Sequence, residues 1–297
     1  MSASLFAFTE TADGARRLAD ELAVPCHSVA THRFPDGESL VRVAPDAART
    51  AVLYRSLDHP DAKIVELLLA ASALRDNGVR RIALVAPYLA YMRQDIAFHP
   101  GEAVSQRVIG ALLARHFECV LTIDPHLHRI QSLEEVMPGA DAVSLTAAGL
   151  ISQAIDAADA PVLVGPDAES RQWVEAIARP LGLDTLIGRK QRGGDRQVAI
   201  AFPENARIRG RRAILVDDVI SSGETLAMAA RLLREAGARG IEAMATHCLA
   251  RDEDLLRLEA AGIERIVSTD SVPGPTARLC VAPLLAPALR QFLAKAG

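Results

Sequence analysis

The sequence predicts an α/β protein of two domains, each with a mostly parallel sheet flanked by helices. Two observations support this fold class. Short apolar runs rich in β-branched residues alternate with helical patterns along the chain, which is typical of layers built around parallel sheets. The 297 residues are also too many for most single cores, and they suit two domains of about 150 residues each.

The alternation can be followed from end to end. The expected strands cover 5–8, 51–54, 82–86, 119–123, 161–164, 213–216, 241–248 and 265–267. The expected helices cover 14–22, 62–77, 104–117, 147–158, 169–181, 225–236, 252–261 and 286–296. The second half starts afresh with a helix near 147, so we place the boundary near 145. The predicted domains are therefore 1–145 and 146–297.

Composition excludes several classes of function. A net charge of −4 gives no attraction to nucleic acid or to a membrane surface. Aromatic residues make up only 4% of the chain, which leaves few platforms for stacking bases. No apolar run approaches the length of a membrane span, and the N-terminus lacks a basic region followed by an apolar one. We therefore expect neither nucleic acid nor membrane as a partner.

The cysteines indicate the compartment. The four cysteines lie far apart and form no CxxC pair, which argues against a disulfide framework and against structural zinc. A reducing cytoplasm fits this usage, and we expect a cytoplasmic protein.

The segment AILVDDVISSGET at 213–225 carries the strongest site signal. An apolar run at 213–216 ends in Asp217 and Asp218, and a loop of small residues then leads into a helical pattern. Ligands of open α/β sheets bind where strand ends meet helix N-termini, and the unpaired N–H groups there favour an anion. Carboxylates beside a phosphate suit sugar hydroxyls or a divalent cation. The segment therefore predicts a phosphorylated-sugar site; the alternative is that the two aspartates only cap the helix.

Four more segments place polar residues in turns or after strand-like runs. FPDGE at 34–38 has two carboxylates around a glycine, although Pro-Asp-Gly is also ordinary turn chemistry. In 87–95, Arg93 could neutralise a phosphate and Gln94 could position it, unless the segment is only a solvated loop. IDPHLH at 123–128 offers His126 for a divalent ion or a phosphate, although a lone histidine is usually structural. VGPD at 164–167 ends another strand in a carboxylate.

Lysine usage singles out one further position. Of 33 basic residues only three are lysines, and Lys63 and Lys295 fall at natural solvent positions. Lys190 lies in the basic, glycine-rich segment GRKQRGGD at 188–195. Because the chain otherwise prefers arginine, a lysine here suggests a need for a compact ammonium group. The common phosphate and hydrolase signatures are absent: the sequence has no GxxxxGK[ST], GxGxxG, HExxH or GxSxG.

Together these segments resemble the ribose-phosphate pyrophosphokinase family, also called phosphoribosyl pyrophosphate synthetases, over nearly the whole chain. The family's FxDGE appears at 34–38, YxRQD at 91–95 and D-x-H at 124–126. Its G-P-D appears at 165–167, K-x-R at 190–192 and the sugar-phosphate loop at 217–225. The resemblance implies two phosphoribosyltransferase-like domains.

It also implies a reaction, in which the β,γ-diphosphoryl group of ATP moves to the C1 hydroxyl of ribose 5-phosphate, giving phosphoribosyl pyrophosphate and AMP. The cofactor implied is Mg²⁺, held by His126 and Asp167, and the catalytic residues implied are Lys190 and Arg192. The implied assembly is a homo-oligomer built on dimers. The implied ATP-binding residues are Phe34, Asp36, Gly37, Glu38, Arg93 and Gln94. The implied ribose 5-phosphate residues are Asp217, Asp218, Ser221, Ser222, Gly223, Glu224 and Thr225.

Departures from the common pattern concern substrate preference and allosteric control more than the reaction. Common members read DTxGT where this chain has SSGET at 221–225, which resembles the archaeal-type branch. Glu224 stands where glycine is usual, so its charge must point away from a bound phosphate. His128 and Ile96 also depart from the usual residues. Two alternatives remain: a non-catalytic homologue that binds nucleotide and sugar phosphate to regulate a partner, and a phosphoribosyltransferase.

Overall fold

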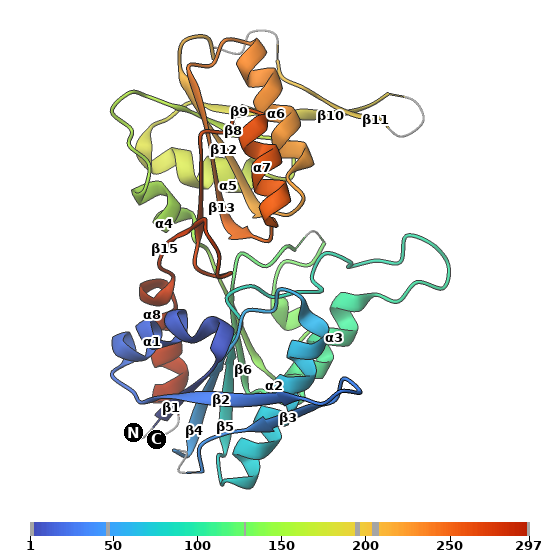
Figure 1. Ribbon diagram of the computed structural model, residues 1–297, viewed down its shortest axis with the longest axis vertical. Helices are drawn as coiled ribbons and strands as arrows, with labels where there is room; N and C mark the ends of the chain where they lie inside the picture. The colour runs from blue at the N-terminus through green and yellow to red at the C-terminus, as the bar shows by residue number, and fades with distance from the viewer. Residues whose placement is uncertain (1–2, 46–47, 128, 194–196, 204–207, 296–297) are drawn as a thin grey trace. The chain divides into compact units, whose positions relative to one another are not determined.

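The computed structural model describes residues 3–45, 48–127, 129–193, 197–203 and 208–295, except the side chains of 190–199. The chain divides into two compact units, Met1–Thr146 with Cys280–Gly297, and Ala147–Leu279. Each unit is an α/β layer structure, which confirms the predicted fold class (Figure 1). None of the described helices is both long enough and apolar enough to span a bilayer.

The described residues of the first unit form a seven-stranded sheet in the order β3-β2-β1-β4-β5-β6-β7, parallel except for the β2–β3 pair. The strands are β1 Ala3–Phe8, β2 Cys26–Arg33, β3 Ser39–Arg42, β4 Thr50–Tyr54, β5 Arg81–Val85, β6 Cys119–Ile123 and β7 Asp141–Leu145. The helices are α1 Ala12–Leu22, α2 Pro60–Asp76, α3 Ser105–Ala114 and α8 Ala282–Ala294, with short 3-10 turns η1 Thr9–Thr11 and η2 Leu133–Glu135.

Strand order decides which face each helix covers. The chain passes from β1 to β2 in one direction and from β4 through β5 to β6 in the other. Because parallel crossovers are right-handed, α1 covers one face of the sheet and α2 and α3 cover the opposite face (Figure 1). Strands β4, β5 and β6 are apolar and almost fully buried, as central parallel strands require.

The C-terminal helix belongs to the first unit. Leu285, Leu289 and Phe292 of α8 are buried, and α8 packs beside α1 and against β6 and β7 (Figure 1). Arg81 of β5 lies over the Phe292 ring at 4.2 Å and donates a hydrogen bond to the Phe292 carbonyl. The predicted second domain, 146–297, is therefore wrong at its end, because the apolar face of α8 is buried by the first sheet.

The described residues of the second unit form a six-stranded parallel sheet in the order β15-β14-β13-β12-β8-β9, together with the antiparallel ribbon β10–β11. Its strands are β8 Val162–Gly165, β9 Thr185–Ile187, β10 Arg189–Gly193, β11 Gln197–Ala201, β12 Arg212–Ile220, β13 Gly240–Cys248, β14 Arg265–Thr269 and β15 Ala277–Leu279. Its helices are α4 Ala148–Gln153, α5 Arg171–Ala178, α6 Glu224–Glu235 and α7 Asp252–Ala260, with the 3-10 turn η3 Arg179–Leu181.

Each predicted strand overlaps an observed one. The strands that were not predicted from the sequence are β2, β3, β7, β9, β10, β11 and β15. In β2 only Val29 is buried, so the strand has no apolar alternation from which it could be recognised. Lys63 also differs from expectation: its side chain is only 13% exposed, because its ammonium group binds Asp58 and the Ser56 carbonyl.

Candidate functional site

The central feature of the second unit is the end of β12. The sequence analysis ended this strand at Val216, but β12 continues through Asp217 and Asp218 to Ile220, paired with β13. On its other side, the pairing with β8 stops at Leu215. The two aspartates therefore lie where β12 has lost one neighbour, beside the loop that follows β8.

Asp167 lies in that loop, close enough for its negative charge to affect the ionisation of Asp217. Burial raises the pKa of Asp217 well above its usual value, and the negative charges of Asp218 and then Asp167 raise it further. Three carboxylates thus lie near the end of β12, and the charges of Asp218 and Asp167 both act on the ionisation of Asp217. Hydroxyl donors or a cation bound there would favour the ionised form of Asp217.

The 221–225 loop joins this edge to α6. Ser221, Ser222 and Glu224 are exposed, Thr225 is partly buried, and Gly223 is the N-cap of the helix. Gly223 adopts φ 72°, and a Cβ there would meet the Leu258 side chain at 2.9 Å. Glycine is therefore required for the turn that presents the helix N-terminus to solvent. The Glu224 carboxylate is 76% exposed and lies 3.9 Å from the Arg257 guanidinium of α7.

Asp167 also orders its own loop. Its Oδ1 accepts hydrogen bonds from the backbone N–H groups of Glu169 and Ser170, at 3.0 and 3.3 Å, and the Ser170 hydroxyl donates to the Asp167 carbonyl at 2.7 Å. The carboxylate is thus held at the start of the turn that leads into α5.

The segment proposed to be catalytic forms part of the β10–β11 ribbon, which the sequence did not predict. Lys190 pairs with Ile200 and Arg192 pairs with Val198. The ribbon extends from the second unit (Figure 1). The side chains of Lys190 and Arg192 lie outside the described part of the structure, so their roles stay predictions.

In the first unit, the 34–38 segment is the turn of the β2–β3 hairpin. Phe34 and Glu38 close it through a backbone hydrogen bond of 2.8 Å, and Asp36 accepts one from the Glu38 N–H at 3.1 Å. Gly37 has φ 94°, and the whole turn is exposed. Phe34 is 39% exposed and meets His32 edge to face. An exposed aromatic and two exposed carboxylates at a hairpin tip are available to a ligand.

The 91–95 loop follows β5 and precedes α3. Arg93 is exposed and Gln94 is partly buried, so both side chains are accessible. Tyr91 adopts φ 65°, and its hydroxyl donates to Asp61 of α2, a hydrogen bond that raises the pKa of the tyrosine. The loop therefore has a defined, strained backbone rather than the conformation of a solvated linker.

The D-x-H segment follows β6 directly. Asp124 is buried with φ 36°, and its N–H donates to the Leu145 carbonyl at 2.8 Å. His126 is partly buried, whereas His128 lies outside the described residues. The predicted metal ligands belong to different units, His126 to the first and Asp167 to the second.

Among the described residues, no group of three or more His, Cys, Asp or Glu side chains is arranged to hold a metal ion. A magnesium site would not require such a group, because Mg²⁺ usually keeps several waters and binds through one or two carboxylates together with substrate phosphates.

Two residues that the sequence did not single out, Gln106 and Arg129, contact the 91–95 segment. Gln106, at the start of α3, is buried and donates to the Met92 carbonyl at 3.1 Å. Arg129 donates to Asp95 at 2.6 Å. A glutamine inside an apolar helical pattern was the available signal for the first; nothing local marks the second.

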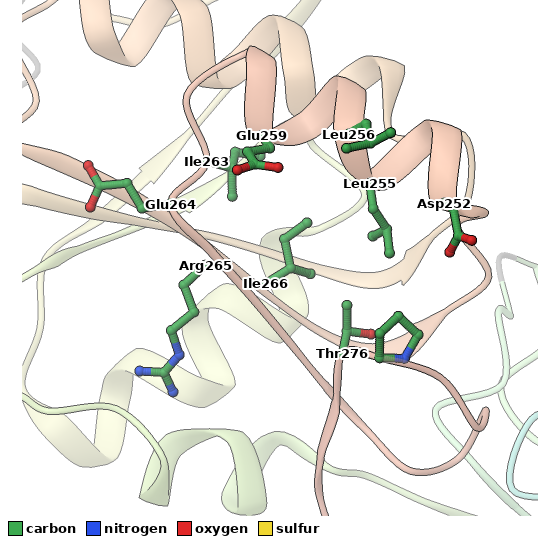
Figure 2. A pocket seen from close by; sticks show the side chains of 10 residues that line it. Asp252, Leu255, Leu256, Glu259, Ile263, Glu264, Arg265, Ile266 and Thr276 are labelled. Atoms are coloured by element: carbon green, nitrogen blue, oxygen red, sulfur yellow. The ribbon is translucent and has the colours of Figure 1, made fainter.

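A hollow of about 460 Å³ opens elsewhere in the second unit, against α7 and β14 (Figure 2). Its walls combine apolar and acidic side chains, and none of the predicted site residues lines it. Its lining is Asp252, Leu255, Leu256, Glu259, Ile263, Glu264, Arg265, Ile266, Pro275 and Thr276. It is therefore separate from the candidate site.

Comparisons with known proteins match most of the chain. Residues 3–116 match the N-terminal domain of ribose phosphate pyrophosphokinase, and residues 130–263 match the phosphoribosyl transferase domain. The ribose-phosphate pyrophosphokinase of Methanopyrus kandleri is 35% identical over 93% of this chain and 95% of its own length. That of Pyrococcus furiosus is 30% identical over 91% and 96%. The crystal structure of phosphoribosylpyrophosphate synthetase from Mycobacterium smegmatis matches 99% of this chain and 100% of that one, with a TM-score of 0.86 and 27% identity.

Proposed function

Because the chain belongs to the ribose-phosphate pyrophosphokinase family, we propose that it transfers the diphosphoryl group of ATP to ribose 5-phosphate. The C1 hydroxyl oxygen attacks the β-phosphorus and loses its proton, and the bond from that phosphorus to the α-phosphate oxygen breaks. The products are phosphoribosyl pyrophosphate and AMP. The observation that carries the proposal is the carboxylate cluster at the end of β12, directly before a glycine turn and a helix N-terminus.

The sugar phosphate is the ligand that suits this cluster. Asp217 and Asp218 accept hydrogen bonds from the ribose hydroxyls, and these donors favour the ionised form of Asp217. The residues at 221–225 bind the 5-phosphate through loop N–H groups, hydroxyls and the positive end of α6. The position of Glu224 beside Arg257 supports this role, since the ion pair draws its charge toward α7.

The nucleotide binds to the first unit. Phe34 lies against the adenine, and Asp36, Gly37 and Glu38 form hydrogen bonds around it. Arg93 neutralises phosphate charge and Gln94 positions the nucleotide. The exposure of the 34–38 turn and of Arg93 supports these roles, because both can reach a ligand without unfolding.

Catalysis of diphosphoryl transfer depends on alignment and positive charge, since the transition state spreads negative charge over phosphate oxygens. Lys190 and Arg192 supply that charge at the transferred group. His126 and Asp167 would hold magnesium, which neutralises phosphate charge when bound. We further propose a cytoplasmic homo-oligomer built on dimers; sedimentation equilibrium of the purified chain tests the assembly.

The direct test is incubation with ATP, magnesium and ribose 5-phosphate. AMP and phosphoribosyl pyrophosphate should appear in equal amounts. A regulatory homologue would bind both ligands without forming either product. A phosphoribosyltransferase would instead consume phosphoribosyl pyrophosphate when a base is added. Formation of ADP, or of no phosphorylated product, would contradict the proposal.

Replacing Asp217 with alanine should chiefly weaken the binding of ribose 5-phosphate. Loss of an acceptor for a sugar hydroxyl costs about 1–3 kcal/mol, so the KM for ribose 5-phosphate should rise about tenfold or more. The KM for ATP should change little. Initial rates with each substrate varied in turn measure both constants, and an unchanged KM for the sugar would contradict the role of Asp217.

A further inference from the structure

The start of α3 holds the 91–95 loop from one side. The Gln106 side chain donates to the Met92 carbonyl at 3.1 Å, and its backbone N–H donates to the Gln94 carbonyl at 3.3 Å. The neighbouring Ser105 hydroxyl donates to the Tyr91 carbonyl at 3.4 Å. These hydrogen bonds fix the backbone around Arg93, but none of them holds Asp95 at the end of the loop.

That contact is the ion pair between Asp95 and Arg129. The Asp95 side chain is 1% exposed, and its Oδ1 lies 2.6 Å from a guanidinium nitrogen of Arg129. Its Oδ2 is buried without a hydrogen-bond partner in the described part of the chain. A buried carboxylate needs a compensating charge, so the place of Asp95 depends on Arg129.

The segment that carries Arg129 is itself anchored on α3. Ser132 and Glu135 form a capping box that closes η2, and Glu135 also accepts from the Gln131 N–H at 2.8 Å. The segment then runs against α3 so closely that a Cβ at Gly110 would collide with the Val136 carbonyl. Arg129 and Gln106 are both fixed relative to α3. They therefore hold the two sides of the 91–95 loop in a constant position relative to each other.

We propose that Arg129 is a positioning residue, which fixes Asp95 and thereby sets Arg93 and Gln94 in their binding geometry for the nucleotide. This inference rests on the proposed function for its ligand. Arg129 follows the D-x-H segment by three residues, so the same ion pair also ties the His126 loop to the nucleotide loop. Arg129 does not touch the reacting atoms, and its effect acts through Asp95.

The test compares Arg129→Gln with Arg107→Gln, a matched control. Arg107 is an exposed residue of α3 for which no ion pair is found among the described residues, so both variants lose one positive charge in the same unit. Arg129→Lys keeps the charge, Asp95→Asn removes only the carboxylate, and Asp95→Asn/Arg129→Gln removes both members of the pair. The readouts are hydrogen exchange of the 91–95 amides, affinity for the magnesium complex of a non-hydrolysable ATP analogue, and KM against kcat.

In Arg129→Gln, the 91–95 amides should exchange about tenfold faster and the affinity for the analogue should fall about tenfold. The KM for ATP should rise with it, with the KM for ribose 5-phosphate unchanged and kcat within about twofold. Arg129→Lys should recover most of the affinity. The double variant should lose less affinity for the analogue than the two single variants lose together, because no unpaired buried charge remains.

Unchanged exchange in Arg129→Gln, or an equal loss of affinity in Arg107→Gln, overturns the inference. Hydrogen exchange and analogue binding need no turnover, so they separate this inference from the proposed reaction. A wild-type chain that binds the analogue but forms no AMP contradicts the reaction alone. A wild-type chain that binds no nucleotide overturns both.

Discussion

Replacing Lys190 with alanine should lower kcat by about 10²- to 10³-fold and leave the affinity for ATP nearly unchanged. An ammonium group that meets charge developing on the transferred group contributes mostly in the transition state. Binding of ground-state ATP therefore loses little when it is removed. Lys190→Arg should recover only part of the rate, because a planar guanidinium cannot reproduce a compact point charge.

The measurement is the rate of AMP formation at saturating substrates, together with calorimetric binding of a non-hydrolysable ATP analogue. Lys295→Ala is the matched control, since Lys295 is 63% exposed and pairs with Asp141. The control should keep the wild-type rate. If Lys190→Ala loses affinity and turnover in equal proportion, Lys190 is a binding residue and the catalytic role is wrong.

Replacing Arg55 with leucine should destabilise the first unit by about 3–5 kcal/mol, the usual cost of leaving a buried ionised group without its partner. The Arg55 side chain is 6% exposed and lies 2.7 Å from Glu66 of α2, whose side chain is 9% exposed. It also binds Glu10 at 2.7 Å and lies over the Phe8 ring at 3.7 Å. Leucine keeps the apolar contact with the Phe8 ring but leaves the Glu66 carboxylate without its cationic partner.

The Arg55–Glu66 ion pair also supports the 34–38 turn, which we propose binds the nucleotide. Glu66 accepts a hydrogen bond from Ser39 at 2.9 Å and lies 3.7 Å from Arg33. Those two residues flank the 34–38 turn, so Arg55→Leu should weaken nucleotide binding as well as folding. A change in stability without any change in nucleotide affinity would show that the turn is held independently of this pair.

The loss of stability caused by Arg55→Leu should depend on pH. Burial raises the pKa of Glu66, but hydrogen bonds from Arg55 and Ser39 and the charges of Arg55 and Arg33 outweigh it and lower the pKa. A carboxyl whose pKa is lower in the folded state stabilises fully above its ordinary pKa, and this is lost as pH falls through the folded value. The gap between wild type and Arg55→Leu should therefore be complete above about pH 5 and shrink below about pH 4.

Two spectroscopic probes resolve the units in chemical denaturation. The three tyrosines, Tyr54, Tyr88 and Tyr91, all lie in the first unit, and the single tryptophan, Trp173, lies in the second. The tyrosine transition should shift in Arg55→Leu. The control is Arg16→Leu, which breaks an exposed pair with Asp13 and should cost less than about 1 kcal/mol. Equal shifts for the two variants would contradict the importance of burial.

Features that depend on local sequence were predicted, whereas features that depend on pairing between distant segments were missed. The fold class is confirmed because short apolar runs such as 119–123 form buried parallel strands, as their composition predicted. The extent of β12 was wrong, because pairing with β13 continues past the apolar run and holds Asp217 and Asp218 in the strand. Backbone pairing requires no particular side chain, so neither this extension nor the β2–β3 hairpin left a periodic signal.

The sequence by itself determined the order of the helices and of the most apolar strands, the family and the candidate residues, because these depend on short motifs and on local patterns of apolar residues. Tertiary structure decided which distant charges meet: Asp167 with Asp217, Arg55 with Glu66, and Arg129 with Asp95. It also assigned α8 to the first unit. Such contacts arise from strand order and from the burial of apolar faces, which bring together residues that no local pattern connects.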